Sequence, residues 1–204
     1  MSDPTDPRAP DPALRRTEWG VAIFALAAIA AHDGVHVSEG RWWDTFWVCN
    51  LAALLVGPSI LLRSPLLAAA CLTWLVPGTV VWLVDGLCSG QNILPTSYLI
   101  HFGGTAAAIY STRVNGWSPR GWLAALGLFA FAVLVARYAL PPGTNVNAAR
   151  DVPRGWSTPA GGYAVFVAIE LGIALAACGL GSLLGRLIAG GAGTRAGAAG
   201  GVSG

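Results

Sequence analysis

The sequence predicts an all-α protein, a polytopic membrane bundle of about six transmembrane helices. Hydrophobic residues make up 54% of the 204-residue chain and charged residues only 11%, which leaves more apolar surface than a soluble globule of this size can bury. The apolar residues fall into six runs, and about 20 residues are needed to cross a bilayer core. Six spans therefore use most of the chain, and no separate soluble domain is expected.

Each apolar run is bounded by segments rich in Gly, Pro, Asn and Asp, the residues that end helices. The runs cover residues 18–31, 42–62, 66–84, 96–110, 122–140 and 162–188. The tight break RSP predicts a hairpin between the second and third spans. The first and fourth runs are short for a core of ~30 Å, so we expect them to recruit flanking residues.

The two ends of the chain differ in composition from the spans. Residues 1–16, MSDPTDPRAPDPALRR, are rich in proline and charge and predict a disordered tail. Residues 189–204 are mostly Gly and Ala and predict a second disordered tail. The predicted organisation is therefore a single six-helix domain, residues 17–188, between two tails.

The charges predict the orientation of the bundle and exclude some partners. A formal net charge of +2 is too small to suggest nucleic-acid binding. With six spans, eight arginines fall on the side of the termini and three on the opposite side, with one near that boundary. Short loops with excess positive charge stay in the cytoplasm, so we expect both termini to be cytoplasmic. The four cysteines are scattered singly, and neither a disulfide framework nor a metal or cofactor is expected.

The polar residues inside the spans gather toward the end opposite the termini. Counting from the span ends at 1.5 Å per residue, Cys49 lies ~10 Å and His101 ~8 Å into their helices from that side. Ionisable groups are costly in hydrocarbon and often mark a site. An imidazole can take the proton of a thiol and so activate it for acyl transfer. The alternative is structural, with Cys49 a small apolar filler and His101 bonded to a neighbouring helix.

Other polar residues of this layer are candidates for supporting roles. Thr45 lies four residues before Cys49, one helical turn away on the same face, and is an alternative nucleophile. Asn amides can donate to an oxyanion, although Asn145 and Asn147 also suit a turn. The candidate substrate-binding residues are Asn50, Asp85, Asn145 and Asn147.

The remaining polar pairs are interpreted structurally. His32 and His36 have the H-x-x-x-H spacing of a helical metal site, but Gly34 lies between them at a helix end, which favours a cap at the membrane surface. No metal site is therefore expected. Arg137 and Glu170 occur at similar depth, and we expect an ion pair that allows both to be buried.

Four segments carry a resemblance to a known family: WVCNLAALL around Cys49, LVPG at 75–78, YLIHFGG around His101, and GTNVN at 143–147. Their layout resembles the YwaF-type bacterial integral membrane proteins and their eukaryotic transmembrane relatives. The resemblance implies a six-helix fold in the inner membrane of a bacterium. It also implies phospholipid acyl transfer, with Cys49 as nucleophile and His101 as base, and a phospholipid or lysophospholipid as partner.

Three functions follow from these observations as hypotheses. The first is a lipid acyltransferase or acyl-ester hydrolase that uses an intramembrane Cys49–His101 pair. The second is a non-catalytic membrane protein: a carrier, a ligand-binding protein or an assembly protein. The third is a Thr/His membrane hydrolase that uses Thr45, because TFWVCN also resembles a segment of small polytopic hydrolases with a Thr and His pair.

Overall fold

The computed structural model describes residues 12–89, 93–151 and 162–199 and shows an all-α bundle, as predicted. No β-strand occurs in these three ranges. The long helices are α1 (Pro12–Ser38), α2 (Val48–Leu61), α3 (Pro65–Ser89), α6 (Gly121–Tyr138) and α7 (Gly162–Ala199). A sixth helix is continuous through α4 (Pro95–Tyr98), the π-helical η2 (Leu99–Gly104) and α5 (Thr105–Asn115). Two short 3₁₀ segments, η1 (Trp42–Phe46) and η3 (Val146–Ala148), lie in the connections.

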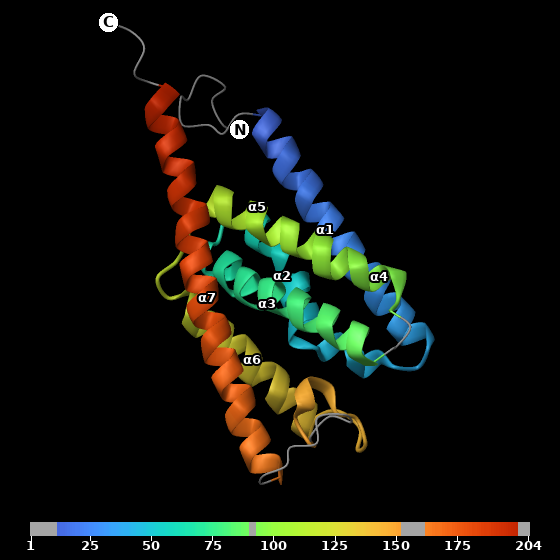
Figure 1. Cartoon of the computed structure of the whole chain (residues 1–204). Helices are drawn as coiled ribbons and strands as arrows, with labels where there is room; N and C mark the ends of the chain where they lie inside the picture. The colour runs from blue at the N-terminus through green and yellow to red at the C-terminus, as the bar shows by residue number, and fades with distance from the viewer. Residues whose placement is uncertain (1–11, 90–92, 152–161, 200–204) are drawn as a thin grey trace, which may run out of the picture.

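Successive helices run in alternating directions, so the start of α1 and the end of α7 lie at the same end of the bundle (Figure 1). At this end Glu18 of α1 forms an ion pair of 3.0 Å with Arg63, which follows α2. The opposite end contains η1 and η3, which pack against each other. We call it the η1–η3 end.

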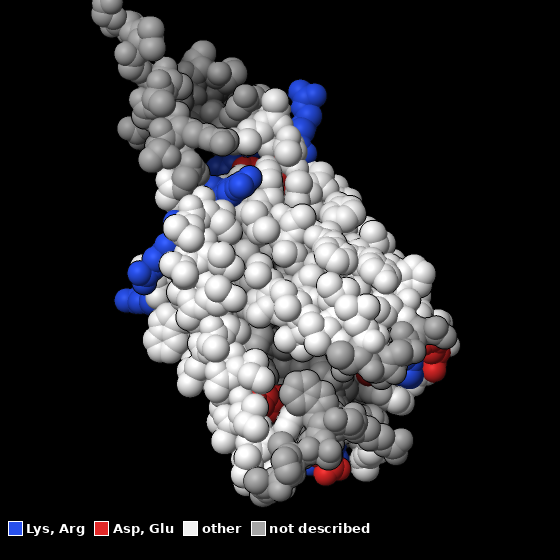
Figure 2. All heavy atoms as spheres, in the orientation of Figure 1, with Lys and Arg blue, Asp and Glu red and all other residues white. Residues whose placement is uncertain are grey.

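The helices identify the chain as a multi-pass membrane protein. Within the described ranges, four helices are long and apolar enough to cross a membrane: Ala13–Ser38, Pro65–Val84, Gly121–Tyr138 and Gly162–Gly190. The face in Figure 2 carries its charged side chains toward the two ends, with a broad uncharged band between them. This distribution matches a hydrocarbon layer between two polar interfaces.

The expectation of six full-length spans is corrected to about four. The predicted run 42–62 is not one helix, because η1 is separated from α2 by Trp47 in an extended conformation (φ −58°, ψ 136°). The remaining α2 has 14 residues and is about 21 Å long at 1.5 Å per residue, which is shorter than the ~30 Å of a bilayer core.

The predicted tails are shorter than expected. Helix α1 begins at Pro12 and α7 continues to Ala199, so residues 12–16 and 189–199 are helical. Proline is favourable in the first turn of a helix, and alanine has the highest helix propensity. The rest of both predicted tails lies outside the described residues.

Helix α3 is the centre of the bundle and packs against α2, α5, α6 and α7. Its fully buried face contains the small residues Ala68, Ala69 and Cys71. Small side chains let helix backbones approach closely, which is how membrane helices gain packing energy without a hydrophobic driving force. The close approach extends to α7, where Gly181 lies against Thr73.

We expect Gly181→Ala to destabilise the bundle at this contact. A Cβ at residue 181 would lie 2.9 Å from the Thr73 Cα and 2.5 Å from its Oγ1, and backbone atoms cannot easily move. Overpacking of this kind lowers the free energy of unfolding by roughly 1–3 kcal/mol. Thermal unfolding of the protein in detergent micelles measures the change.

Gly179→Ala is the matched control in the same helix, since nothing lies within 4 Å of its added Cβ. This substitution should leave the stability unchanged or raise it, because alanine is the better helix former. Equal destabilisation by both substitutions would contradict the α3–α7 contact.

Candidate functional site

A buried asparagine from the last long loop fixes the start of α2. The Oδ1 atom of Asn147 accepts a hydrogen bond from the Val48 N–H at 2.9 Å, and its Nδ2 donates to the Phe46 carbonyl at 2.8 Å. Asn147 has a φ of 52°, a left-handed conformation that asparagine tolerates better than most residues. The two bonds bracket Trp47 and hold the chain where η1 ends and α2 begins.

This break changes the predicted position of Cys49. Cys49 is the second residue of α2 and partly exposed, so it lies in the first turn of a helix and not ~10 Å along one, as expected from an unbroken span. The positive end of the helix dipole stabilises a thiolate placed there. The first N–H groups of a helix have no acceptor within it, so those of Cys49 and Asn50 are candidate oxyanion donors.

Thr45 does not lie one helical turn below Cys49. It belongs to η1, where its hydroxyl donates to the Trp42 carbonyl at 2.8 Å. The predicted common face was wrong because Trp47 interrupts the helix between the two residues. The role of Thr45 as an alternative nucleophile stays a prediction.

His101 lies in the π-helical segment η2 and is 5% exposed. Its ring stacks on Trp82 of α3, with centroids 4.3 Å apart and planes at 13°. The hydroxyl of Thr79 donates to the His101 carbonyl at 2.9 Å. The Nδ1 atom is buried without a hydrogen-bond partner among the described residues. Short π-helical segments are frequent at functional sites, and this ring nitrogen is available to a substrate or a water.

One face of α3 lies against both Cys49 and His101. An added Cβ at Gly78 would be 3.6 Å from the Cβ of Cys49, and Trp82, four residues later on the same helix face, stacks on His101. No hydrogen bond joins the thiol to the imidazole; the described polar neighbour of the thiol is Asn50 Oδ1 at 3.9 Å. Both side chains therefore lie against the same face of α3, a common wall, about one helical turn apart along it.

Helix α1 packs against the two elements that carry these side chains. It contacts α2, which carries Cys49, and η2, which carries His101. One Asp33 oxygen is buried without a hydrogen-bond partner in the part of the chain that the structure describes. Helix α1 thus forms a second wall of the candidate site.

His32 and His36 are buried and do not cap a helix at the membrane surface. They are 5% and 8% exposed, and their Nε2 atoms lie 3.1 Å apart. Helix α1 continues through Gly34 to Ser38, so the expected helix end does not fall between them. The His36 Nδ1 lies 3.5 Å from an oxygen of Asp44. The H-x-x-x-H spacing was the signal for this pair, but it does not reveal burial.

The charged residues of η1 and the loop before it complete this cluster. Arg41 donates to Asp44 and to Glu39, both at 2.6 Å. The hydrogen bond to Glu39, together with the negative charges of Asp44 and Glu39, raises the pKa of Arg41 above its usual value. Arg41 therefore stays charged and holds the carboxylate of Asp44 beside the histidines.

The amides of the other predicted asparagines bind backbone groups. Asn50 donates to the Asp44 carbonyl at 2.9 Å. Asn145 donates to the Asp151 carbonyl at 2.8 Å and accepts from the N–H groups of Arg150 and Asp151, each at 3.0 Å, which folds the loop around it. The side chain of Asp85 lies outside the described part of the structure, so its predicted role is untested.

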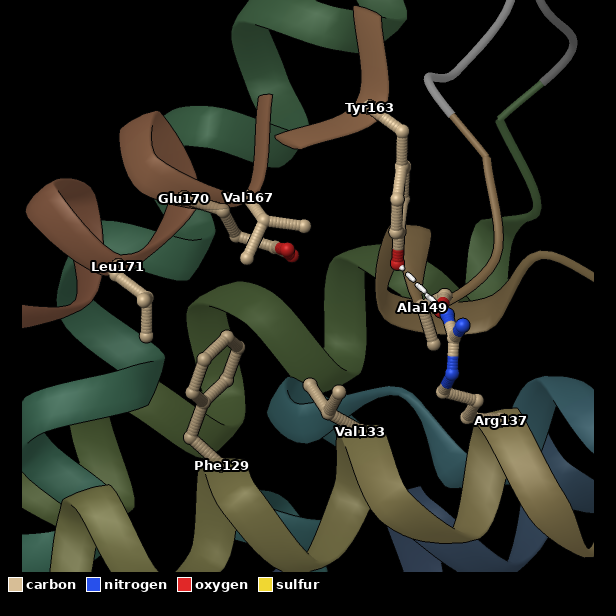
Figure 3. A pocket seen from close by; sticks show the side chains of 8 residues that line it. All are labelled: Phe129, Val133, Arg137, Ala149, Tyr163, Val167, Glu170 and Leu171. Atoms are coloured by element: carbon tan, nitrogen blue, oxygen red, sulfur yellow. Dashed lines mark hydrogen bonds between the residues drawn. The ribbon is translucent and has the colours of Figure 1, made fainter. Parts of the chain in front are cut away.

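A separate cavity of about 280 Å³ opens between α6, α7 and the loop after η3 (Figure 3). Arg137 donates to the Ala149 carbonyl at 2.8 Å and to the Tyr163 hydroxyl at 3.3 Å. The predicted ion pair with Glu170 is not formed, because Arg137 turns toward the loop. The lining residues are Phe129, Val133, Arg137, Ala149, Tyr163, Val167, Glu170 and Leu171.

Comparison with models of known protein families, with curated proteins and with solved structures finds no match.

We expect Asn147→Ala to loosen the start of α2. The substitution leaves the Val48 N–H and the Phe46 carbonyl without their partner, which costs about 1–3 kcal/mol when such groups are buried. Hydrogen exchange followed by mass spectrometry should show faster exchange in the first turn of α2 and unchanged exchange in α7.

Asn115→Ala is the control, because the Asn115 amide donates to the Ser59 carbonyl at 2.8 Å, at the other end of α2. It should leave exchange in the first turn of α2 unchanged. If Asn147→Ala also leaves it unchanged, Asn147 does not fix the start of this helix.

Proposed function

We propose that this protein is a membrane lipid acyltransferase or acyl-ester hydrolase in which Cys49 is the nucleophile and His101 the general base. The main support is the common wall of α3, on which Gly78 faces Cys49 and Trp82 stacks on His101. A thiol at a helix start and a buried imidazole with an unpartnered nitrogen are the two groups that acyl transfer requires.

The YwaF-type relationship is part of the proposal. Its support is that the four segments that carry the resemblance lie close together in the structure, although they are far apart in the chain. Asn147 of the GTNVN segment binds the backbone at the start of α2, Gly78 of LVPG lies against Cys49, and Thr79, which directly follows LVPG, bonds the His101 carbonyl. A functional constraint on a common site explains why such separate segments belong to one pattern.

The proposed reaction has two steps. A rotation of the Cys49 side chain or a bridging water connects the thiol to His101, which takes its proton. The thiolate attacks the ester carbonyl of a donor phospholipid, and the alcohol of the departing lysophospholipid takes the proton from His101. In the second step a lysophospholipid hydroxyl or water gives its proton to His101 and attacks the thioester, and the proton returns to the thiol. The first-turn N–H groups of α2 stabilise each oxyanion.

The location that fits this reaction is the inner membrane of a bacterium, with both termini in the cytoplasm. The support is the arginine distribution, since positively charged short loops stay cytoplasmic. On the terminal side of the bundle are Arg15, Arg16, Arg63, Arg113, Arg120 and Arg186. Cys49 and His101 then lie toward the outer leaflet, where phospholipid and lysophospholipid substrates reach them from the bilayer.

A non-catalytic carrier or ligand-binding protein is the second candidate, and the cavity between α6 and α7 favours it. This cavity has mainly apolar walls and is distinct from the α3 wall. Ligand binding there would require neither Cys49 nor His101. An acyl-transfer assay with Cys49 and His101 variants separates the two candidates.

We expect the purified protein in micelles to transfer or release a labelled acyl chain from a phospholipid. Cys49→Ala should lower this rate on the order of 10³-fold or more, because it removes the nucleophile. His101→Ala should lower it about 10²–10⁴-fold, the usual contribution of a general base. Cys71→Ala is the matched control, since Cys71 is buried in the apolar core, and it should retain the activity.

Two results would overturn the assignment. Full activity of Cys49→Ala with loss of activity in Thr45→Ala would identify Thr45 as the nucleophile. The second is the absence of turnover of any phospholipid ester, together with lipid binding that is the same in Cys49→Ala and His101→Ala as in the wild type. This result would support the carrier.

A further inference from the structure

The two histidines of α1 face each other with a spacing typical of metal ligands. His32 and His36 are four residues apart, on the same face of the helix, and their Nε2 atoms lie 3.1 Å apart. Two imidazoles bound to one zinc ion at 2.0–2.1 Å in tetrahedral geometry have nitrogens roughly 3.3 Å apart. The pair is therefore close to the arrangement in which both nitrogens bind one ion.

The other nitrogen of each ring has its own polar neighbour. His32 Nδ1 is 3.0 Å from the Thr96 hydroxyl, and His36 Nδ1 is 3.5 Å from Asp44 Oδ2. Histidine ligands of metals nearly always have such a partner on the second nitrogen, which fixes the tautomer and the ring orientation. The Thr96 hydroxyl of α4 thus orients the His32 ring, whereas the Asp44 carboxylate of η1 acts on His36 through its charge and makes no hydrogen bond to Nδ1.

The charges around the pair favour a cation. Asp44 lies beside His36, and Arg41 bonds both Asp44 and Glu39, so that two carboxylates face one guanidinium. The cluster therefore carries an excess of negative charge at the η1–η3 end. Asp33 lies three residues before His36, on the same side of α1, and one of its oxygens is buried without a partner in the described ranges.

We propose that His32 and His36 bind a divalent transition-metal ion of the zinc type. Imidazole nitrogens suit zinc, copper and nickel ions better than magnesium or calcium. Among the described residues no third His, Cys, Asp or Glu side chain completes a ligand set with them, so water or an added ligand fills the remaining positions. The site does not depend on the proposed acyl chemistry, because it involves neither Cys49 nor the unpartnered nitrogen of His101.

Zinc titration by calorimetry tests this site directly in the full-length protein in micelles. The chain has three histidines, so a purification tag without histidine leaves only one outside the proposed site. We expect one zinc ion per chain, an affinity loss of at least ~100-fold in His32→Ala and in His36→Ala, and a loss of about 10–100-fold in Asp44→Asn, which removes the outer charge. His101→Ala is the control and should bind zinc as the wild type does.

Several results would overturn the proposal. One is the absence of saturable zinc binding by the wild-type protein, in which case the two imidazoles share a hydrogen bond only. Another is unchanged affinity in the folded His32→Ala and His36→Ala variants, with folding checked by thermal unfolding. If these variants do not fold, Asp44→Asn still decides, because unchanged zinc affinity in that variant would contradict the site.

Discussion

The two hydrogen bonds between Asn147 and the backbone around Trp47 are the constraint on which the candidate site depends. They end η1, start α2 and connect the last long loop to the second helix. Without this break, Cys49 would lie within a continuous span, remote from any free N–H group. With it, the thiol lies in the first turn of a helix, where the helix dipole and unpaired donors are concentrated.

The second constraint is that polar groups need partners where water is scarce. At the η1–η3 end the partners come from different helices: Thr79 of α3 bonds the carbonyl of His101, and Asp44 of η1 faces His36 of α1. Arg137 of α6 bonds the carbonyl of Ala149. These bonds hold the helices in register at one end, while the centre of the bundle packs through small apolar residues.

The fold class could be predicted from the sequence because composition and apolar runs directly reflect the lipid environment. Cys49 and His101 could be singled out as candidates for a similar reason, since polar residues inside apolar runs are conspicuous; their catalytic roles stay a prediction. The break at Trp47 could not be predicted, because run 42–62 has no Gly or Pro near residue 47 and the cause of the break, Asn147, lies a hundred residues away. The burial of His32 and the bonding of Arg137 to a loop carbonyl also depend on tertiary packing.

The most direct test of the account is whether residues 49 and 101 are neighbours. The background is a variant in which Cys71, Cys88 and Cys178 are replaced by alanine, so that Cys49 is the remaining thiol. Adding His101→Cys gives a second thiol. A short bifunctional methanethiosulfonate reagent then bridges the two thiols if they are close, and mass spectrometry detects the bridge. Placing the second cysteine at exposed Ala106 provides the control. We expect efficient bridging from residue 101 and little from residue 106. Equal bridging from both positions, or none from residue 101, would contradict the shared α3 wall.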